Sequence, residues 1–240
     1  RLEYFQAQGE NQIFLAWKGA GFAITPLSAW KPKRWELGGA KPKPETSGMP
    51  LTVKEEPVLY RNFIEGAGNR AIAVGYPGAV NIAWSAESMN LALLWRGAFI
   101  DAARHWNSRG AGHQPPLGYD VIKPVGDPVT AADRRFIGYT LDATRHPSFR
   151  YQWGEATVSE TFRVDGDKLY RTFNVTGTLP EGATILLAKS DKISINAATY
   201  TITSGPIQWQ LTSNNATLKD HSLSLHLQSG FTTLTYQWIK

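Results

Sequence analysis

Apolar and polar residues alternate in short runs along most of the chain after Val58. The clearest runs are ATVSETFRV at 156–164 and SLSLHLQ at 222–228. Alternation with a period of two predicts β-strands that turn one face toward a core and the other toward solvent. Gly, Pro, Asn or Ser turns recur about every ten residues, a spacing that is typical of a sandwich or a barrel.

The number of these runs indicates the size of the fold. About a dozen strands fit between Val58 and Lys240, which is too many for a small immunoglobulin-like domain. The sequence therefore predicts an all-β fold, a large antiparallel β-sandwich over residues 58–240. One short helical turn is expected from Asp101 to Trp106, with Asp101 as its N-cap.

The first 57 residues follow a different pattern. Residues 1–30 contain two or three short strand-like runs, and residues 31–57 hold five of the fourteen prolines together with several glycines and lysines. A Pro-rich, charged segment without periodicity is typical of an extended linker. We therefore expect strands of a second module at 1–30, a linker at 31–57 whose part 38–50 is open to protease, and the main domain at 58–240.

Composition narrows the class of protein. The hydrophobic fraction of 42% in 240 residues is that of a globular chain, and no run reaches the roughly eighteen apolar residues of a membrane span. The lack of cysteine excludes disulfides, thiolate metal sites, a Cys nucleophile and covalent c-type haem attachment. The net charge of +5 is dispersed, so nucleic acid is not an expected partner.

The stretch from Leu91 to Gly118 begins as a strand and then carries the densest set of functional side chains. A loop that bears charge, imidazole and indole beside a β scaffold is a common place for binding or chemistry. The plainer alternative is a long loop packed over a sheet, with its Arg and Asp side chains paired to one another. The residues concerned are Asp101, Arg104, His105, Trp106, Arg109 and His113.

Aromatic residues favour binding over catalysis in this loop. The chain has nine Trp and nine Tyr, and aromatic faces beside Arg and Asp commonly hold sugars by stacking and hydrogen bonding. We expect Trp95 and Trp153 to fill the core, and Arg104 or Arg109 to pair with a carboxylate. The candidate binding residues are Trp106, His105, Arg109, Arg104, Asp101 and Arg96.

Signals of catalysis are weaker. A glycosidase needs two acids placed across its substrate, and Glu160 in TVSETF is interpreted as a solvent-facing strand residue. His105 and His113 are weak candidates for a metal, because no H-E-x-x-H or comparable spacing occurs. We expect no catalytic residue and no cofactor within this chain. The other acids considered are Asp101, Asp120, Asp142 and Glu155.

Residues 1–30 resemble the last strands of a PA14 domain. That family often ends in an R-x-E-Y-F strand, an L-x-W-x-G-P-G strand and an I-P-x-x-x-L tail. The similar pieces here are Arg1-Leu-Glu-Tyr-Phe-Gln, Leu15-Ala-Trp-Lys-Gly-Ala-Gly21, with Ala20 in place of the usual Pro, and Pro26-Leu-Ser28. PA14 modules commonly bind carbohydrate. The aspartates that hold calcium in their sugar-binding members are not among these residues.

Residues 58–162 resemble a poorly characterised β domain of large secreted proteins from planctomycetes and related bacteria. The series comprises Tyr60-Arg-Asn-Phe-Ile-Glu-Gly-Ala-Gly68, Arg70-Ala-Ile-Ala-Val-Gly-Tyr-Pro-Gly78, Leu91-Ala-Leu-Leu-Trp-Arg-Gly-Ala-Phe-Ile-Asp101, Ala103-Arg-His-Trp106, Pro115-Pro-Leu-Gly118 and Phe149-Arg-Tyr-Gln-Trp-Gly154. In those proteins the domain accompanies c-type cytochrome, PA14-type and quinoprotein-like modules. The resemblance implies a periplasmic or extracellular location, with any haem on a partner module.

Together these features predict a non-catalytic extracytoplasmic module for recognition or scaffolding within a larger redox-associated assembly, with a glycan as the expected ligand. Two alternatives stay open. One is an enzyme that acts on polysaccharide. The other is a docking subunit whose Arg and Lys residues meet the acidic rim of a c-type cytochrome.

Overall fold

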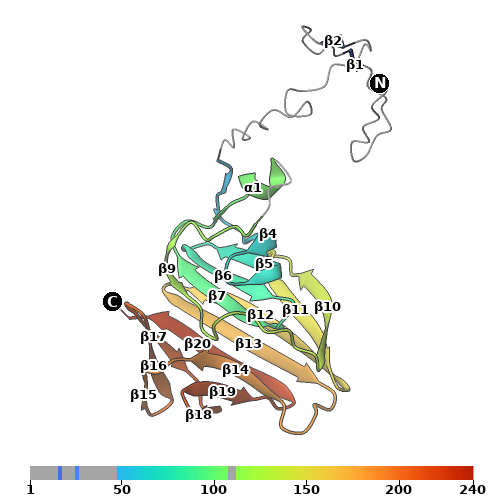
Figure 1. Ribbon diagram of the computed structural model, residues 1–240. Coiled ribbons are helices and arrows are strands. Elements are labelled where there is room, and N and C mark those ends of the chain that lie inside the picture. The colour runs from blue at the N-terminus through green and yellow to red at the C-terminus, as the bar shows by residue number, and fades with distance from the viewer. Residues whose placement is uncertain (1–15, 18–24, 27–47, 108–111, 240) are drawn as a thin grey trace. The chain divides into compact units, whose positions relative to one another are not determined.

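The structure is a computed structural model that describes residues 16–17, 25–26, 48–107 and 112–239 (Figure 1). The chain divides into two compact units, Arg1–Glu45 and Thr46–Lys240. In the first unit β1 (Ala16–Trp17) pairs antiparallel with β2 (Thr25–Pro26). The rest of the expected PA14-like strands, and the linker as far as residue 47, lie outside the described residues.

The structure confirms the all-β prediction, since strands hold 60% of the described residues and helices 2%. A five-stranded antiparallel sheet has the order β4-β5-β6-β7-β9. Its strands are Val58–Ile64, Gly68–Tyr76, Val80–Ser85, Asn90–Arg96 and Tyr119–Ile122. A short pair, β3 (Pro50–Leu51) and β8 (Ile100–Asp101), precedes helix α1 (Ala103–Trp106). No helix of the described residues is long and apolar enough to cross a membrane.

The remaining strands form two further sheets. An eight-stranded antiparallel sheet has the order β10-β11-β12-β13-β20-β17-β16-β15. In that order its strands are Arg134–Leu141, Pro147–Trp153, Ala156–Asp165, Lys168–Thr176, Gly230–Trp238, Ile207–Thr212, Thr199–Ser204 and Ile193–Asn196. A three-stranded sheet of order β14-β19-β18 contains Thr184–Lys189, Ser222–His226 and Ala216–Lys219.

One large core joins all three sheets. Trp84 of β6 stacks on Phe149 of β11 with ring centroids 4.6 Å apart, so the five-stranded sheet faces the eight-stranded one. Leu187 and Leu225, from β14 and β19, belong to the same buried cluster. Sheets packed face to face around shared apolar side chains make sandwich-like layers, which Figure 1 shows between the five-stranded sheet and β10 to β13.

The five-stranded sheet is buried on its second face as well. Every residue of β6 is buried, and a separate cluster on this outer face is rich in alanine. Leu51 of β3, Val53 just after it and Phe99 just before β8 cover these small residues. A Cβ added at Gly75 would lie 2.5 Å from Val53 Cγ2 and 2.8 Å from Phe99 Cγ. The cover therefore needs small residues beneath it. The alanines are Ala67, Ala71, Ala73, Ala83, Ala92 and Ala102.

Trp95 and Trp153 are buried, which confirms their expected place in the core. The interpretation of Glu160 was wrong, because this side chain is 0% exposed. On β12 Glu160 has the same parity as Ala156, Val158 and Phe162, which are all buried. In a strand, residues two apart point to the same face, so the alternation itself turns Glu160 toward the core.

Candidate functional site

Helix α1 is fixed to the scaffold by Asp101. One carboxylate oxygen of Asp101, Oδ1, accepts hydrogen bonds from Ala103 N–H and Met49 N–H, both at 2.8 Å. The sequence pattern predicted Asp101 as the N-cap, and this was wrong. The N-cap is Ala102, whose backbone is already helical (φ −82°, ψ −8°). Asp101 instead joins the start of the helix to the segment before β3.

His105 is held at both ring nitrogens. Its Nε2 lies 3.0 Å from the carbonyl oxygen of Gly112, which can only accept, so Nε2 carries the hydrogen. Nδ1 then accepts a hydrogen bond from the Tyr60 hydroxyl at 2.5 Å. Burial raises the pKa of Tyr60 to about 12, while the Arg104 guanidinium lowers it and the Asp101 carboxylate raises it further. Tyr60 therefore keeps its proton and fixes the orientation of the imidazole.

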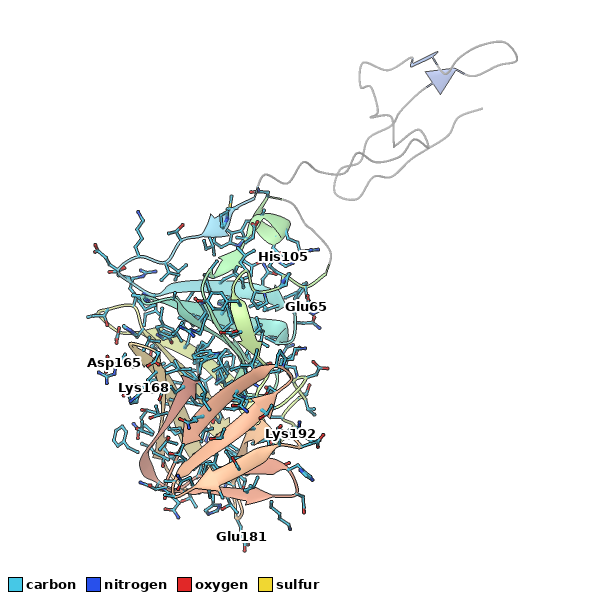
Figure 2. All side chains as sticks on the ribbon, turned by 90° about the vertical axis from the view of Figure 1, so that its left-hand side faces the viewer. Glu65, His105, Asp165, Lys168, Glu181 and Lys192 are labelled. Carbon is cyan, nitrogen blue, oxygen red and sulfur yellow. The ribbon has the colours of Figure 1, made fainter. Side chains whose placement is uncertain are left out.

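Trp106 follows on the same helix and is 55% exposed, as its place in the loop predicts. Its ring centroid lies 5.9 Å from that of the buried Tyr60. Phe63, which is 44% exposed, packs edge-on against His105 with centroids 5.9 Å apart, and lies 6.0 Å from His113. We call the set Trp106, Phe63, His105 and His113 the aromatic platform. Figure 2 labels its His105.

The returning half of the loop is attached to strand β4. The backbone N–H of Gln114 donates to the Phe63 carbonyl at 2.9 Å, and Glu65 N–H donates to the Gln114 carbonyl at 3.0 Å. The buried side chain of Gln114 accepts a hydrogen bond from Arg104 Nε at 3.1 Å. Arg104 therefore connects helix α1 to the returning half of the loop. Arg109 lies outside the described residues.

An open hollow of about 470 Å³ adjoins the platform. His113 belongs to both, and its Nε2 is 2.9 Å from Asn69 Oδ1. The hollow is lined by Glu65, Gly66, Gly68, His113, Asp127 and Pro128. It thus offers two carboxylates beside exposed aromatic rings, a combination suited to the hydroxyl groups and ring faces of a sugar.

Arg96 does not belong to this site. Along β7, Leu94 contacts the large core and Trp95 the outer cluster, so Arg96 points to the inner side of the sheet. Its guanidinium lies 5.9 Å from the ring centroids of both Tyr119 and Trp238. One of its nitrogens is 3.9 Å from an Asp120 carboxylate oxygen. Successive side chains of β7 point to opposite faces of the sheet, so Arg96 lies on the face away from the other candidate binding residues.

The two histidines proposed for a metal have other partners. Both nitrogens of His105 are engaged by protein groups, and His113 contacts an amide. Within the described parts of the chain, no group of three or more His, Asp or Glu residues is arranged to hold a metal ion. Two of the acids considered for catalysis are also engaged: Asp142 accepts hydrogen bonds from Thr144 and His146, and Glu160 accepts one from Arg171.

Sequence reasoning found His105 and Trp106 but missed the residues from β4 that complete the site. Phe63 falls out of step with the buried Tyr60 and Ile64, so an exposed aromatic could have been inferred there. Its approach to His105 could not, because 42 positions of sequence separate them and no short-range pattern connects them.

Comparison with known proteins identifies no family. No protein-family profile and no curated protein matches the chain. Among solved structures, the periplasmic domain of Thermotoga maritima YidC aligns with a TM-score of 0.37 at 10% sequence identity, covering 75% of this chain and 85% of that one. A likeness this distant carries no argument about function.

Proposed function

We propose that this protein is a non-catalytic glycan-recognition module of an extracytoplasmic assembly, and that the aromatic platform is its binding surface. The observation that carries the proposal is the exposed Trp106 ring, on a helix whose neighbours are fixed by hydrogen bonds. An exposed indole face stacks on the apolar face of a sugar ring, and a helix that is already fixed in place loses little conformational entropy on binding.

The polar groups around Trp106 support a sugar ligand. His113 and Glu65 border the hollow beside the platform, and such groups exchange hydrogen bonds with hydroxyl groups. The His105 imidazole already uses both nitrogens. Its role is therefore to support the platform, and the carbohydrate contacts come from the exposed residues around it.

The test is affinity electrophoresis and titration calorimetry of the full chain against a panel of neutral and acidic polysaccharides. Trp106→Ala should weaken binding about tenfold or more, because central aromatic contacts often contribute 1.4 kcal/mol or more, which is a factor of about ten. The matched control is Phe231→Ala, which removes a ring that is 79% exposed on β20, outside the platform.

Two results decide the proposal. Binding that is lost in Trp106→Ala and retained in Phe231→Ala supports it. A wild-type chain that binds no polysaccharide of the panel, or a Trp106→Ala variant that binds as tightly as wild type, overturns it. Release of reducing ends during the same incubations would instead support the polysaccharide-acting enzyme.

A further inference from the structure

A second hollow, of about 720 Å³, lies where the chain leaves β9, passes from β14 to β15, and turns between β16 and β17. Three lysines from two segments line it, Lys123 after β9 and both Lys189 and Lys192 where the chain passes from β14 to β15, and Asp191 is the one acid among its lining residues. Lys123 is paired with Asp127 at 3.3 Å. Lys189 and Lys192 are exposed and form no ion pair with the residues that the structure describes. We call this hollow the lysine cleft.

Backbone hydrogen bonds fix the walls of the lysine cleft. Lys189 N–H donates to the Pro124 carbonyl at 2.7 Å, and Thr203 N–H donates to the Lys192 carbonyl at 3.0 Å. The hydroxyl of Ser190 donates to the Thr203 carbonyl at 2.6 Å and accepts from Lys192 N–H at 3.2 Å. The backbone that carries Lys189 and Lys192 is therefore fixed on both walls of the cleft.

The lysine cleft adjoins the hollow beside the aromatic platform. One loop borders both, since Lys123, Val125 and Gly126 line the cleft while Asp127 and Pro128 line the hollow. Lys123 also packs over Gly66, where an added Cβ would lie 2.6 Å from Lys123 Cε. In Figure 2, His105, Glu65 and Lys192 are labelled along one side of the second unit, and Lys168 is labelled on the other.

We propose that the lysine cleft is a subsite for the anionic groups, sulfate or carboxylate, of an acidic polysaccharide that also contacts the aromatic platform. This inference rests on the proposed function and names its ligand class. Ammonium groups without an acidic partner, gathered at one hollow, create a positive potential that raises the local concentration of anions. Two such groups beside a sugar-sized hollow select a chain that carries charge at intervals.

The experiment measures affinity for dextran, dextran sulfate and polygalacturonate of matched length, at about 0.15 M salt. The test variant is Lys189→Gln with Lys192→Gln. The matched control, Arg150→Gln with Lys168→Gln, removes the same charge from exposed positions of β11 and β13. The test variant should lose about tenfold or more in affinity for the acidic polymer, because it removes two charged hydrogen-bond donors. The control should stay within twofold.

The two acidic polymers separate a sulfate subsite from a carboxylate subsite, and Trp106→Ala separates the two proposals. If the test variant binds acidic polymers as well as the control variant does, the lysine cleft is not a subsite. Equal or tighter binding of a single-stranded oligonucleotide of the same charge also overturns the assignment to polysaccharide. If the lysine variant loses binding while Trp106→Ala leaves it unchanged, the cleft stands and the platform proposal fails.

Discussion

The two faces of the five-stranded sheet use polar side chains in opposite ways. Opposite the inner face, Glu160 and Arg171 of the eight-stranded sheet are almost completely buried, and Arg171 Nε donates to Glu160 Oε1 at 2.7 Å. On the outer face, the hydrogen bonds of His105 and Arg104 surround an indole that remains exposed. Both are networks between segments far apart in sequence. The first holds layers together, and the second orients a surface.

The inner network is organised by one guanidinium. Arg171, on β13 of the eight-stranded sheet, donates from Nη2 to Asn90 Oδ1 at 2.7 Å, and Asn90 Nδ2 donates to the Leu186 carbonyl at 2.8 Å. Asn90 begins β7 and Leu186 lies in β14, so this chain of bonds crosses all three sheets. Burial raises the pKa of Glu160, and the guanidinium of Arg171 opposes that shift.

This contrast teaches that polar chemistry alone does not mark a functional site. Burial raises the pKa of Glu160, yet this carboxyl and its partner are enclosed by core residues such as Phe173, whose ring centroid is 4.6 Å from the Arg171 guanidinium. The platform is open to solvent, since Trp106 and Phe63 are exposed. Exposure to solvent distinguishes a surface that can bind from a network that stabilises the fold.

The largest expected effect concerns the inner network. Arg171→Met should lower the free energy of unfolding by about 3 to 5 kcal/mol, because it leaves the carboxylate of Glu160 buried without its cation. Chemical denaturation followed by tryptophan fluorescence measures the change. The double variant Glu160→Met with Arg171→Met should be closer to wild type than the single one. A cost below about 1 kcal/mol for Arg171→Met would show that the pair does not hold the sheets together.

A smaller effect is expected where the outer cover meets the sheet. Gly75→Ala should cost about 1 to 3 kcal/mol, the usual range for an overpacked site, since the new Cβ would lie 2.5 Å from Val53 Cγ2. Adding Val53→Ala should restore part of the loss. Thermal unfolding of the two variants measures this. Equal stability of Gly75→Ala and wild type would mean that the cover over the sheet shifts freely.

The sequence predicted the sheets better than their contacts. Alternation and turn spacing were enough for the all-β class, and β12 and β19, which contain the clearest alternating runs, confirm it. Glu160 was misplaced because its polarity was given more weight than its parity with Val158 and Phe162. Leu51 and Val53 were assigned to the linker, yet they cover the outer face of the five-stranded sheet. The assignment was wrong because two apolar residues in a Pro-rich segment show no local pattern that indicates a packing partner. Long-range partners such as Tyr60 and His105 leave no local pattern.

Tyr60→Phe should have a more modest effect. Loss of its hydrogen bond to His105 should lower the free energy of unfolding by about 0.5 to 1.5 kcal/mol at neutral pH. The pKa of Tyr60 rises from 10.0 to about 12 on folding. The contribution of the protonated Tyr60 hydroxyl to the free energy of unfolding is therefore complete below pH 10 and is lost as the pH rises toward 12. The variant should lose less stability than wild type over that interval in denaturation curves at successive pH values. Parallel losses would show that Tyr60 is not the group concerned.

The smallest expected change in stability is that of Trp106→Ala. This variant distinguishes most directly between an exposed binding surface and a buried network. The Trp106 side chain is 55% exposed, so its removal should alter the free energy of unfolding by no more than about 0.5 kcal/mol. Trp95→Ala is the comparison, because Trp95 is buried and stacks on Phe99 with centroids 6.0 Å apart. It should cost about 3 to 5 kcal/mol.

For each of the two tryptophan variants, we expect one result for stability, from denaturation curves, and one for polysaccharide affinity. Trp106→Ala should keep its stability and lose binding. Trp95→Ala should lose stability, and any folded fraction should bind as wild type does, because its indole lies beneath the cover and donates only to the Ala98 carbonyl at 3.1 Å. A cost of about 3 kcal/mol or more for Trp106→Ala would show that this indole supports the loop, as a buried tryptophan does, and would remove the reason for placing a binding surface there.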